Sequence, residues 1–279
     1  MHLVAPEAVS LLAHDAHTLT LAGRHGERFH ITPLADDLVR VRHYPDGAPR
    51  LDRTWSVVDR SGDVPLEGRP RDDLSPFTLP ELQLVEEAGG LRVCTGKLEL
   101  HIRLGDLRLE WRLPSGEVFA ADVASRAYTY DRAGRAVVHR LACQDGEHYY
   151  GFGEKAGPLD KAGLRLRMEN MDAYGYDAER TDPLYKHIPF YITLVPRLHL
   201  AYGLFYDNLS TTVFDLGKEV NALRGGRYRT YEAADGDLDY YLIFGPTLEA
   251  VIENYTALTG RPVLPPRWAF GYLGSTMHY

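Results

Sequence analysis

Short runs of strictly alternating polar and apolar residues constrain the fold of this chain more than any other feature. Residues 97–103 read Lys-Leu-Glu-Leu-His-Ile-Arg, and residues 107–112 read Leu-Arg-Leu-Glu-Trp-Arg. Side chains along a β-strand point alternately to its two faces, so each run predicts a strand with one apolar and one polar face. Gly105-Asp106 between the runs is typical of a two-residue hairpin turn. Residues 91–95 add a preceding strand, which predicts a meander.

Similar runs recur along most of the chain, at residues 27–31, 39–42, 136–142, 164–168, 188–195, 198–206, 211–214, 228–232 and 239–244. Many short strands joined by Gly, Pro and Asp turns predict antiparallel sheets packed face to face, and they argue against alternating β and α units. By contrast, residues 46–79 are rich in Pro, Gly, Asp and Arg and only weakly periodic, which predicts a long surface excursion.

One helix is predicted near the C-terminus, where the apolar residues form a single stripe at helical spacing: Leu248, Val251, Ile252, Tyr255 and Leu258. Pro246-Thr247 precedes the stripe and Gly260 follows it, as expected for helix ends. Residues 261–266 contain three prolines and predict a stiff connector. The chain is therefore predicted to form a β-sandwich domain over residues 1–260, followed over residues 261–279 by a linker and the start of a second domain.

Composition excludes several classes of protein. The net charge is -8 and the basic residues do not cluster, which argues against a nucleic-acid-binding surface. No apolar stretch is long enough to span a membrane. The N-terminus lacks the basic and apolar regions of a secretory signal, and Cys94 and Cys143 match no metal-binding spacing, so a reduced, cytoplasmic protein is expected. Neither a cofactor nor a metal is expected.

Residues 149–192 are the part of the chain most typical of a ligand site. Gly151 and Gly153 allow a close backbone approach that a side chain would block. Asp172 lies beside a run of aromatic residues, and a carboxylate can accept hydrogen bonds from sugar hydroxyls while aromatic rings cover the apolar faces of the sugar. Taken alone, these residues favour a plainer interpretation, in which the Asp caps a turn and the tyrosines pack inward.

The same segment carries motifs that resemble those of glycoside hydrolase family 31, the α-glucosidase family. They are Gly-Phe-Gly-Glu (151–154), Met-Asp-Ala-Tyr (171–174), Asp-Pro-Leu-Tyr-Lys (182–186), Ile-Pro-Phe-Tyr (188–191) and Pro-Pro-Arg-Trp-Ala-Phe-Gly (265–271). The match runs from residue 149 to residue 279. Many family members have Trp-Asn-Thr-Asp where this chain has Glu169-Asn170-Met171-Asp172, a departure that keeps the acid and changes its neighbours.

This resemblance implies a galactose-mutarotase-like antiparallel supersandwich with one C-terminal helix, followed by a (β/α)8 catalytic barrel whose first strand begins after the linker. It implies that Asp172 reaches the substrate hydroxyls, and that Tyr279, at the end of that first barrel strand, lines the sugar pocket. Glu154, Lys155 and Lys186 are expected to tie the loop to the sandwich.

The family resemblance also implies where catalysis would occur. The nucleophilic Asp of the family lies in a Trp-x-Asp-Met-x-Glu motif, which this sequence does not contain. Cleavage with retention needs two carboxyl groups roughly 5 Å apart, and no acid here carries that signature, so no catalytic residue is assigned. The parent protein would hydrolyse terminal α-linked glucose from oligosaccharides. The chain alone is expected to be inactive, to partner with its own C-terminal barrel, and to expose a terminal strand available for self-association.

Two alternatives remain open from the sequence. One is a free-standing carbohydrate-binding β-sandwich without hydrolase activity. The other is an aldose epimerase, which needs a His paired with an acid in a concave sheet face. His101 and His139 fall in predicted strands, but the sequence does not name a partner acid for either. We interpret the histidines at 14 and 17 as a solvated pair, not as metal ligands. We interpret the alternating acids of residues 235–239 as a polar turn, not as a calcium site.

Overall fold

The computed structural model describes residues 2–221 and 226–274, and antiparallel β-sheets dominate this part of the chain. The largest sheet has eight strands, in the order β15 (His148–Gly151), β17 (Phe190–Val195), β18 (Leu200–Tyr206), β21 (Leu238–Phe244), β5 (Leu38–Tyr44), β4 (Arg28–Ala35), β3 (Leu19–Ala22) and β2 (Ser10–His14). Strands β5 and β21 are neighbours, with Val39 opposite Leu242. The N-terminal strands are therefore joined to the rest of the sheet through β21, the last strand along the described chain.

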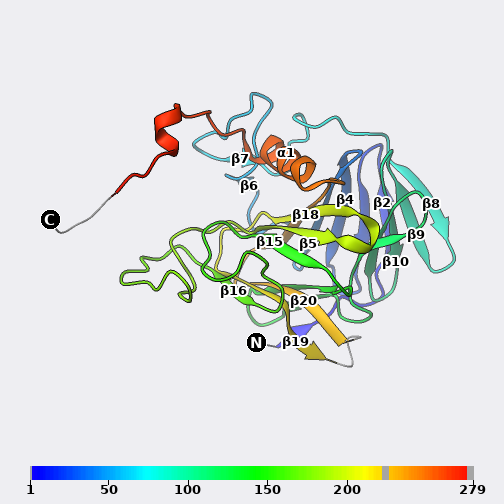
Figure 1. The fold of residues 1–279 in the computed structure, drawn as a ribbon. Coiled ribbons are helices and arrows are strands. Elements are labelled where there is room, and N and C mark those ends of the chain that lie inside the picture. Colours follow the sequence, from blue (N-terminus) through cyan, green and yellow to red (C-terminus); the bar gives the residue numbers. More distant parts are fainter. Residues whose placement is uncertain (1, 222–225, 275–279) are drawn as a thin grey trace.

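Two further sheets complete the sandwich (Figure 1). The six-stranded sheet has the order β1 (Leu3–Val4), β13 (Tyr128–Asp131), β14 (Val137–Ala142), β20 (Gly226–Ala233), β19 (Thr212–Asn221) and β16 (Arg165–Met168). The five-stranded meander has the order β12 (Val118–Ala121), β11 (Arg108–Arg112), β10 (Glu99–Arg103), β9 (Gly90–Cys94) and β8 (Gln83–Glu87). The all-β antiparallel sandwich predicted from the alternating runs is confirmed.

The hairpin of the meander differs in one detail from the prediction. Arg103 lies opposite Arg108, so residues 104–107 form the loop, and the predicted two-residue turn is wrong. Leu107 adopts a left-handed φ of 42° and is almost completely buried. Burying this side chain in the core outweighs the turn preference of Gly105-Asp106, because a buried Leu gains about 1.5–3 kcal/mol over an exposed one.

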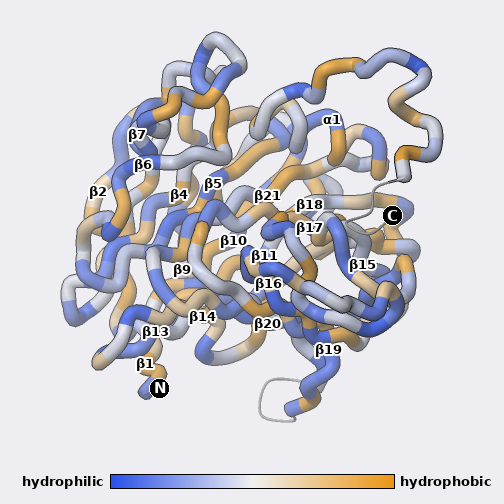
Figure 2. The backbone as a smooth tube through the Cα atoms, turned by 90° about the vertical axis from the view of Figure 1, so that its left-hand side faces the viewer, coloured by the Kyte–Doolittle hydropathy of each residue, from blue (hydrophilic) through white to orange (hydrophobic). Residues whose placement is uncertain are grey.

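The main hydrophobic core draws residues from all three large sheets. Phe119 of the meander packs against Tyr202 of the eight-stranded sheet, with ring centroids 5.4 Å apart. Tyr231 of the six-stranded sheet stacks on Tyr206 at 3.9 Å. Hydrophobic and hydrophilic residues follow one another along many of the strands (Figure 2), as the period of two requires. Many of the tyrosines therefore belong to the core.

Helix α1 (Leu248–Thr259) packs on the other face of the eight-stranded sheet, as the apolar stripe predicted. The Thr247 hydroxyl accepts a hydrogen bond from the backbone amide of Ala250, which caps the first turn. Val251 is buried against the sheet, and Tyr255 stacks on Phe190, the first residue of β17, at a centroid distance of 3.7 Å. The last turns of α1 therefore lie over the start of β17.

The excursion of residues 46–79 lies largely at the surface, as its composition predicted, but a few of its residues anchor it in the body. It contains a short hairpin of β6 (Arg53–Thr54) and β7 (Arg69–Pro70), and the side chains of Arg69 and Arg71 are buried. Arg71 Nη1 lies 2.6 Å from Asp207 Oδ2 and 2.7 Å from Asp239 Oδ2. Weak periodicity did not reveal these anchors, because they are isolated residues: the paired arginines, and Val57, which is buried in the hydrophobic cluster that includes Val251 of α1.

After α1 the chain leaves the body of the sandwich (Figure 1). Residues 267–270 form the 3₁₀ turn η3 (Arg267–Phe270), and residues 271–274 form no strand, so the predicted first barrel strand is absent from the described residues. A parallel strand obtains its backbone hydrogen bonds from neighbouring strands, and the described residues here provide no such neighbours. Tyr279 lies outside the described residues. Over residues 2–221 and 226–274, no helix is long and apolar enough to cross a membrane.

Candidate functional site

The candidate site is the β16–β17 loop, residues 169–189, which runs from the six-stranded sheet to the eight-stranded sheet. It enters β17 at the same end of the large sheet as the end of β15, because Gly151 lies opposite Tyr191. In Figure 1 the green loops beside β15 and β16 project from the sandwich. The loop is therefore held at both ends by sheet structure while its middle reaches into solvent.

Two glycines bring the backbone at the end of β15 close to the end of the loop. A Cβ on Gly151 would lie 2.9 Å from the Phe190 carbonyl oxygen, and one on Gly153 would lie 2.5 Å from the Ile188 side chain. Both glycines also have a positive φ, of 119° and 66°. Between them, the Phe152 backbone amide donates a hydrogen bond of 2.8 Å to Phe190. The predicted role of these glycines in close backbone approach is confirmed.

Charged residues tie the loop to the preceding segment, as expected. The Lys155 side chain is fully buried, and its Nζ lies 2.6 Å from Asp182 Oδ1. Asp182 Oδ2 accepts a 2.6 Å hydrogen bond from the Arg167 backbone amide, and Lys155 Nζ also donates to the Arg167 carbonyl oxygen. An exposed ion pair of 3.0 Å joins Lys186 to Glu154. Asp182 therefore fixes the C-terminal half of the loop to β16.

Asp172 is exposed on this fixed loop, next to the buried Ala173. The hydroxyl of Tyr185 lies beside Asp172, and desolvation, followed by the negative charge of Asp172, raises the pKa of Tyr185. Tyr176 packs edge-on against Tyr185, at a centroid distance of 6.1 Å and an interplanar angle of 88°. The loop thus places a carboxylate, a phenol and an aromatic edge side by side.

The tyrosines of the loop do not pack inward, contrary to the plainer interpretation of the sequence. Tyr174 is 77% exposed, Tyr176 is 52% exposed and Tyr185 is 45% exposed. Exposed aromatic rings beside a carboxylate can cover the apolar face of a sugar while the acid accepts hydrogen bonds from its hydroxyls. Sequence reasoning missed Tyr185 as the partner of Asp172, although it lies in the Asp-Pro-Leu-Tyr-Lys motif. The substrate contacts of Asp172 and Tyr279 remain predictions.

The structure gives His139 the partner acid that the sequence could not name. Its Nε2 lies 2.9 Å from Asp122 Oδ1, but the two side chains are only 0% and 1% exposed. The rings of Tyr128 and Tyr240 stack on His139, each at a centroid distance of 4.8 Å. His101 instead lies on the outer face of the meander, beside Glu87 and Glu99. A sugar could not reach His139 without unfolding the core, so this pair argues against an epimerase site.

The acidic segment of residues 235–239 is a turn that opens β21, as predicted. Its side chains pair with arginines: Asp235 with Arg135 at 2.5 Å, and Asp239 with Arg40 and Arg71. Within the described ranges, no group of three or more His, Cys, Asp or Glu side chains is arranged to hold a metal ion.

Large antiparallel sheets around one core, with one helix on the outer face, define an antiparallel β-sandwich domain. Residues 28–215 match the glycosyl hydrolase 31 N-terminal galactose mutarotase-like domain, and the chain belongs to this family. It is 31% identical over 244 residues to alpha-glucosidase 2 of Bacillus thermoamyloliquefaciens, covering 88% of this chain and 28% of that protein. It is 36% identical over 156 residues to an alpha-glucosidase of Saccharolobus solfataricus, covering 54% and 21% of the two chains.

A solved structure shares the fold. A GH31 dextranase of Flavobacterium johnsoniae, complexed with glucose, has a TM-score of 0.78 and 23% identity, covering 98% of this chain and 30% of that chain. The chain therefore spans less than a third of the length of these relatives.

Proposed function

We propose that this chain is the N-terminal sandwich of a retaining α-glucosidase, which hydrolyses terminal, non-reducing α-linked glucose from oligosaccharides. In this proposal the chain supplies a scaffold and a substrate-contacting loop, and the catalytic acids come from a barrel domain of the same protein. The observation that carries the proposal is Asp172, an exposed carboxylate beside Tyr185 on a loop fixed at both ends.

The direction of the chain after α1 supports this arrangement. Tyr255, near the end of α1, stacks on Phe190, and Phe190 is also the residue at which the β16–β17 loop enters the sheet. Residues 261–274 thus leave the sandwich from the same end as the loop, and both project to the same side in Figure 1. A domain connected by this short, proline-rich linker would lie beside Asp172.

The test is kinetic and uses an α-glucosidase-length protein that contains this sandwich. Asp172→Ala should lower kcat/KM for an α-glucoside by roughly 10- to 150-fold, the loss expected when one charge-assisted hydrogen bond of about 1.5–3 kcal/mol is removed. Glu179→Ala, an exposed acid in the same loop, is the matched control and should leave kcat/KM unchanged. The 279-residue chain alone should release no product.

Two outcomes would contradict the proposal. If Asp172→Ala destabilises the sandwich while kcat/KM is unchanged, Asp172 is a turn cap. If the 279-residue chain alone hydrolyses an α-glucoside after rigorous purification, and the activity maps to one of its carboxylates, the catalytic acids lie within the sandwich.

We also infer that the segment after α1 promotes self-association of the chain when it stands alone. Its large apolar side chains are exposed: Val263 88%, Leu264 87%, Trp268 72%, Phe270 71%, Tyr272 96% and Leu273 69%. Such a continuous exposed apolar strip favours association. Deleting residues from Arg267 onward should reduce any oligomer seen by analytical ultracentrifugation and cost little stability. A strictly monomeric intact chain at high concentration, or unfolding caused by the deletion, would contradict this inference.

A further inference from the structure

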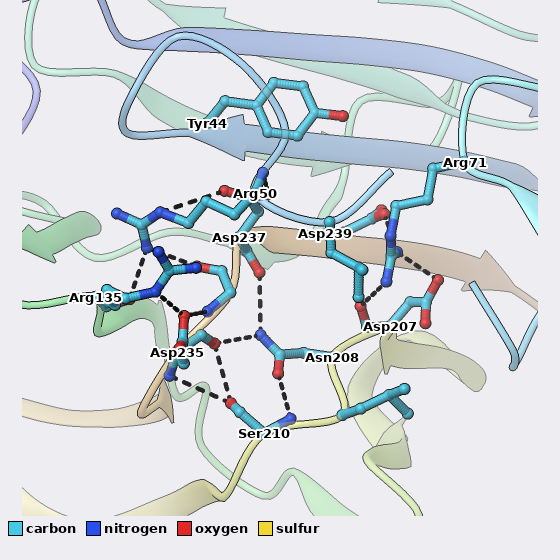
Figure 3. Close-up of a pocket in the computed structure, with 13 residues that line it drawn as sticks. Tyr44, Arg50, Arg71, Arg135, Asp207, Asn208, Ser210, Asp235, Asp237 and Asp239 are labelled. Carbon is cyan, nitrogen blue, oxygen red and sulfur yellow. Dashed lines mark hydrogen bonds and ion pairs between the residues drawn. The ribbon is translucent and has the colours of Figure 1, made fainter. Parts of the chain in front are cut away.

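A separate cavity of about 290 Å³ lies at the same end of the eight-stranded sheet as the β16–β17 loop. We call it the Tyr44 pocket, after the residue that ends β5 (Figure 3). Its walls come from the end of β5, the 46–79 excursion, residues 207–210 after β18, the turn before β21, and Arg135. No single sequence motif spans these segments, so sequence reasoning did not find it.

The polar framework of the pocket is organised without any ligand. Asn208 Nδ2 donates hydrogen bonds to the carbonyl oxygens of Asp235, at 2.8 Å, and Asp237, at 3.2 Å. Asn208 Oδ1 accepts a 2.8 Å hydrogen bond from the Ser210 backbone amide. Figure 3 shows Asn208 at the centre of these contacts. A ligand would therefore meet walls that are already ordered, which lowers the entropic cost of binding.

The charged groups around the pocket are already paired with one another. Arg71 pairs with Asp207 and Asp239, and Arg135 pairs with Asp235. Arg50 is also satisfied, because its side chain pairs with Asp46 and donates to the Gly236 carbonyl oxygen. An incoming ion would have to compete with these pairs. The pocket is therefore suited to a neutral ligand.

Three buried polar atoms in the lining lack a hydrogen-bond partner: the Tyr44 hydroxyl, Asp237 Oδ1 and Asp207 Oδ1. Tyr44 is 4% exposed and its hydroxyl has no hydrogen-bond partner. Asp237 Oδ1 accepts no hydrogen bond and lies 3.9 Å from Arg50 Nε, while Asp237 Oδ2 accepts a 2.7 Å hydrogen bond from the Arg50 backbone amide. Both residues line the cavity, and Figure 3 shows Tyr44 above Asp237 in this view. Buried polar groups without partners are rare and costly, so a ligand hydroxyl that bonds to either would be favoured.

The remaining lining is apolar. Leu51 is 40% exposed and Leu209 is 55% exposed, and both line the same cavity as Tyr44. The pocket thus combines apolar side chains with one hydroxyl and two carboxylate oxygens that have no hydrogen-bond partner. A sugar ring has the matching character, since one face is apolar and its rim is made of neutral hydroxyl groups.

We propose that the Tyr44 pocket binds one neutral sugar ring or a similar cyclic polyol, with its hydroxyls on Tyr44 and Asp237 and its apolar face on Leu209. This site is distinct from the Asp172 loop, and it does not rest on the catalytic role proposed above. The two proposals can fail separately, because one is tested by binding to this chain and the other by turnover in a longer protein.

The experiment titrates the full 279-residue chain with D-glucose and follows backbone amide signals by NMR. Saturable shifts are expected at Leu209 and Gly236. Tyr44→Phe removes only the unpartnered hydroxyl, and it should raise the dissociation constant roughly two- to tenfold. Leu209→Ala should also weaken binding. Leu12→Ala is the matched control, because Leu12 is 53% exposed on the distant strand β2 and should leave binding unchanged. Glucuronate, which is charged, should bind more weakly than glucose.

Tyr44→Phe and Leu209→Ala are expected to keep the fold, since the first retains the ring and the second changes an exposed side chain. Shifts confined to residues 169–189 would place the sugar on the Asp172 loop and overturn the proposal. The absence of any saturable shift would overturn it too, as would equal affinity in all the variants. Tighter binding of glucuronate than of glucose would refute the neutral class of ligand.

Discussion

Two long segments meet at one end of the eight-stranded sheet, where the 46–79 excursion begins after Tyr44 and the β16–β17 loop ends at Phe190, and they differ in how they are held. The 46–79 excursion is drawn into the body: Arg69 and Arg71 are buried, and the Val58 backbone amide donates to the Leu258 carbonyl oxygen in α1. The β16–β17 loop is tied down by Asp182 and Lys155 but leaves Asp172 and its tyrosines in solvent. Both segments are polar in sequence, so polarity alone does not distinguish structure from site.

The difference lies in where the charges find their partners. Arg71 of the excursion meets two acids, Asp207 and Asp239, that are themselves buried in the sandwich. Asp172 instead meets Tyr185, a neutral and partly exposed group. A carboxylate without a cationic partner keeps most of its capacity to accept hydrogen bonds from a ligand. Asp172 of the loop can therefore bind a ligand, whereas the paired arginine of the excursion stabilises the fold.

The largest effect is expected from Arg71→Met, which removes the cation that faces Asp207. Breaking a buried ion pair leaves an uncompensated charge and should lower the free energy of unfolding by about 3–5 kcal/mol. Urea denaturation at neutral pH measures this loss. Arg60→Met, an exposed arginine of the same excursion, is the control and should change stability by less than about 0.5 kcal/mol. Equal small effects of the two substitutions would mean that charge pairing does not hold the excursion.

A smaller effect is expected at Asp237, which accepts a hydrogen bond from Arg50 of the excursion. Burial, opposed by this hydrogen bond and by the charge of Arg50, raises the pKa of Asp237 from 3.8 to about 6. The folded state then holds the proton more tightly than the unfolded state, so the contribution of Asp237 to stability falls as the pH rises from about 4 to about 6. Asp237→Asn, which cannot titrate, should lack this loss.

The relevant measurement is the difference in the free energy of unfolding between Asp237→Asn and the unmodified chain, followed against pH. This difference, taken as variant minus unmodified chain, should increase by roughly 1–3 kcal/mol from pH 4 to pH 6 and stay constant at higher pH. A difference that is flat over this range would show that Asp237 has an ordinary pKa. A difference that decreases between pH 4 and pH 6 would show that the fold stabilises the carboxylate form of Asp237.

The smallest effect is expected from Asp172→Ala in this chain alone. Because Asp172 is exposed and its named partner is Tyr185, the substitution should change the free energy of unfolding by no more than about 0.5 kcal/mol. Thermal and urea unfolding of the purified variant test this. A loss comparable to that of Arg71→Met would remove the contrast between the two segments and make Asp172 a structural residue.

Strands and the helix were predictable from sequence because their packing leaves a periodic trace. The alternation of residues 97–103 reflects β10, and the stripe that includes Val251 and Leu258 reflects α1. The 46–79 excursion leaves no such trace, since Arg71 is buried by acids far away in the chain. Similarly, the loop between β10 and β11 is set by the burial of Leu107, a tertiary effect that a turn motif does not report.

The candidate site was predictable only in part. Asp172 and the glycines at 151 and 153 stand in a recognisable motif, and the structure supplies the close backbone approach that the glycines allow. The contact between Asp172 and Tyr185 joins residues that no local pattern links. The Tyr44 pocket is even harder to predict from sequence, because its walls meet only once β5, β18 and β21 have paired.

The pairing of β5 with β21 has a consequence for how the chain is made. On a ribosome, the β2–β5 hairpins can form early, but the edge of β5 lacks its neighbour until the strand that ends at Phe244 has emerged. Such distant pairings slow folding, and an open edge strand invites aggregation. Arg40, which lies on β5 and pairs with Asp239 of β21, would remain an unpaired charge on this strand during the delay. An arginine that is later paired in the sandwich would thus also protect the nascent chain.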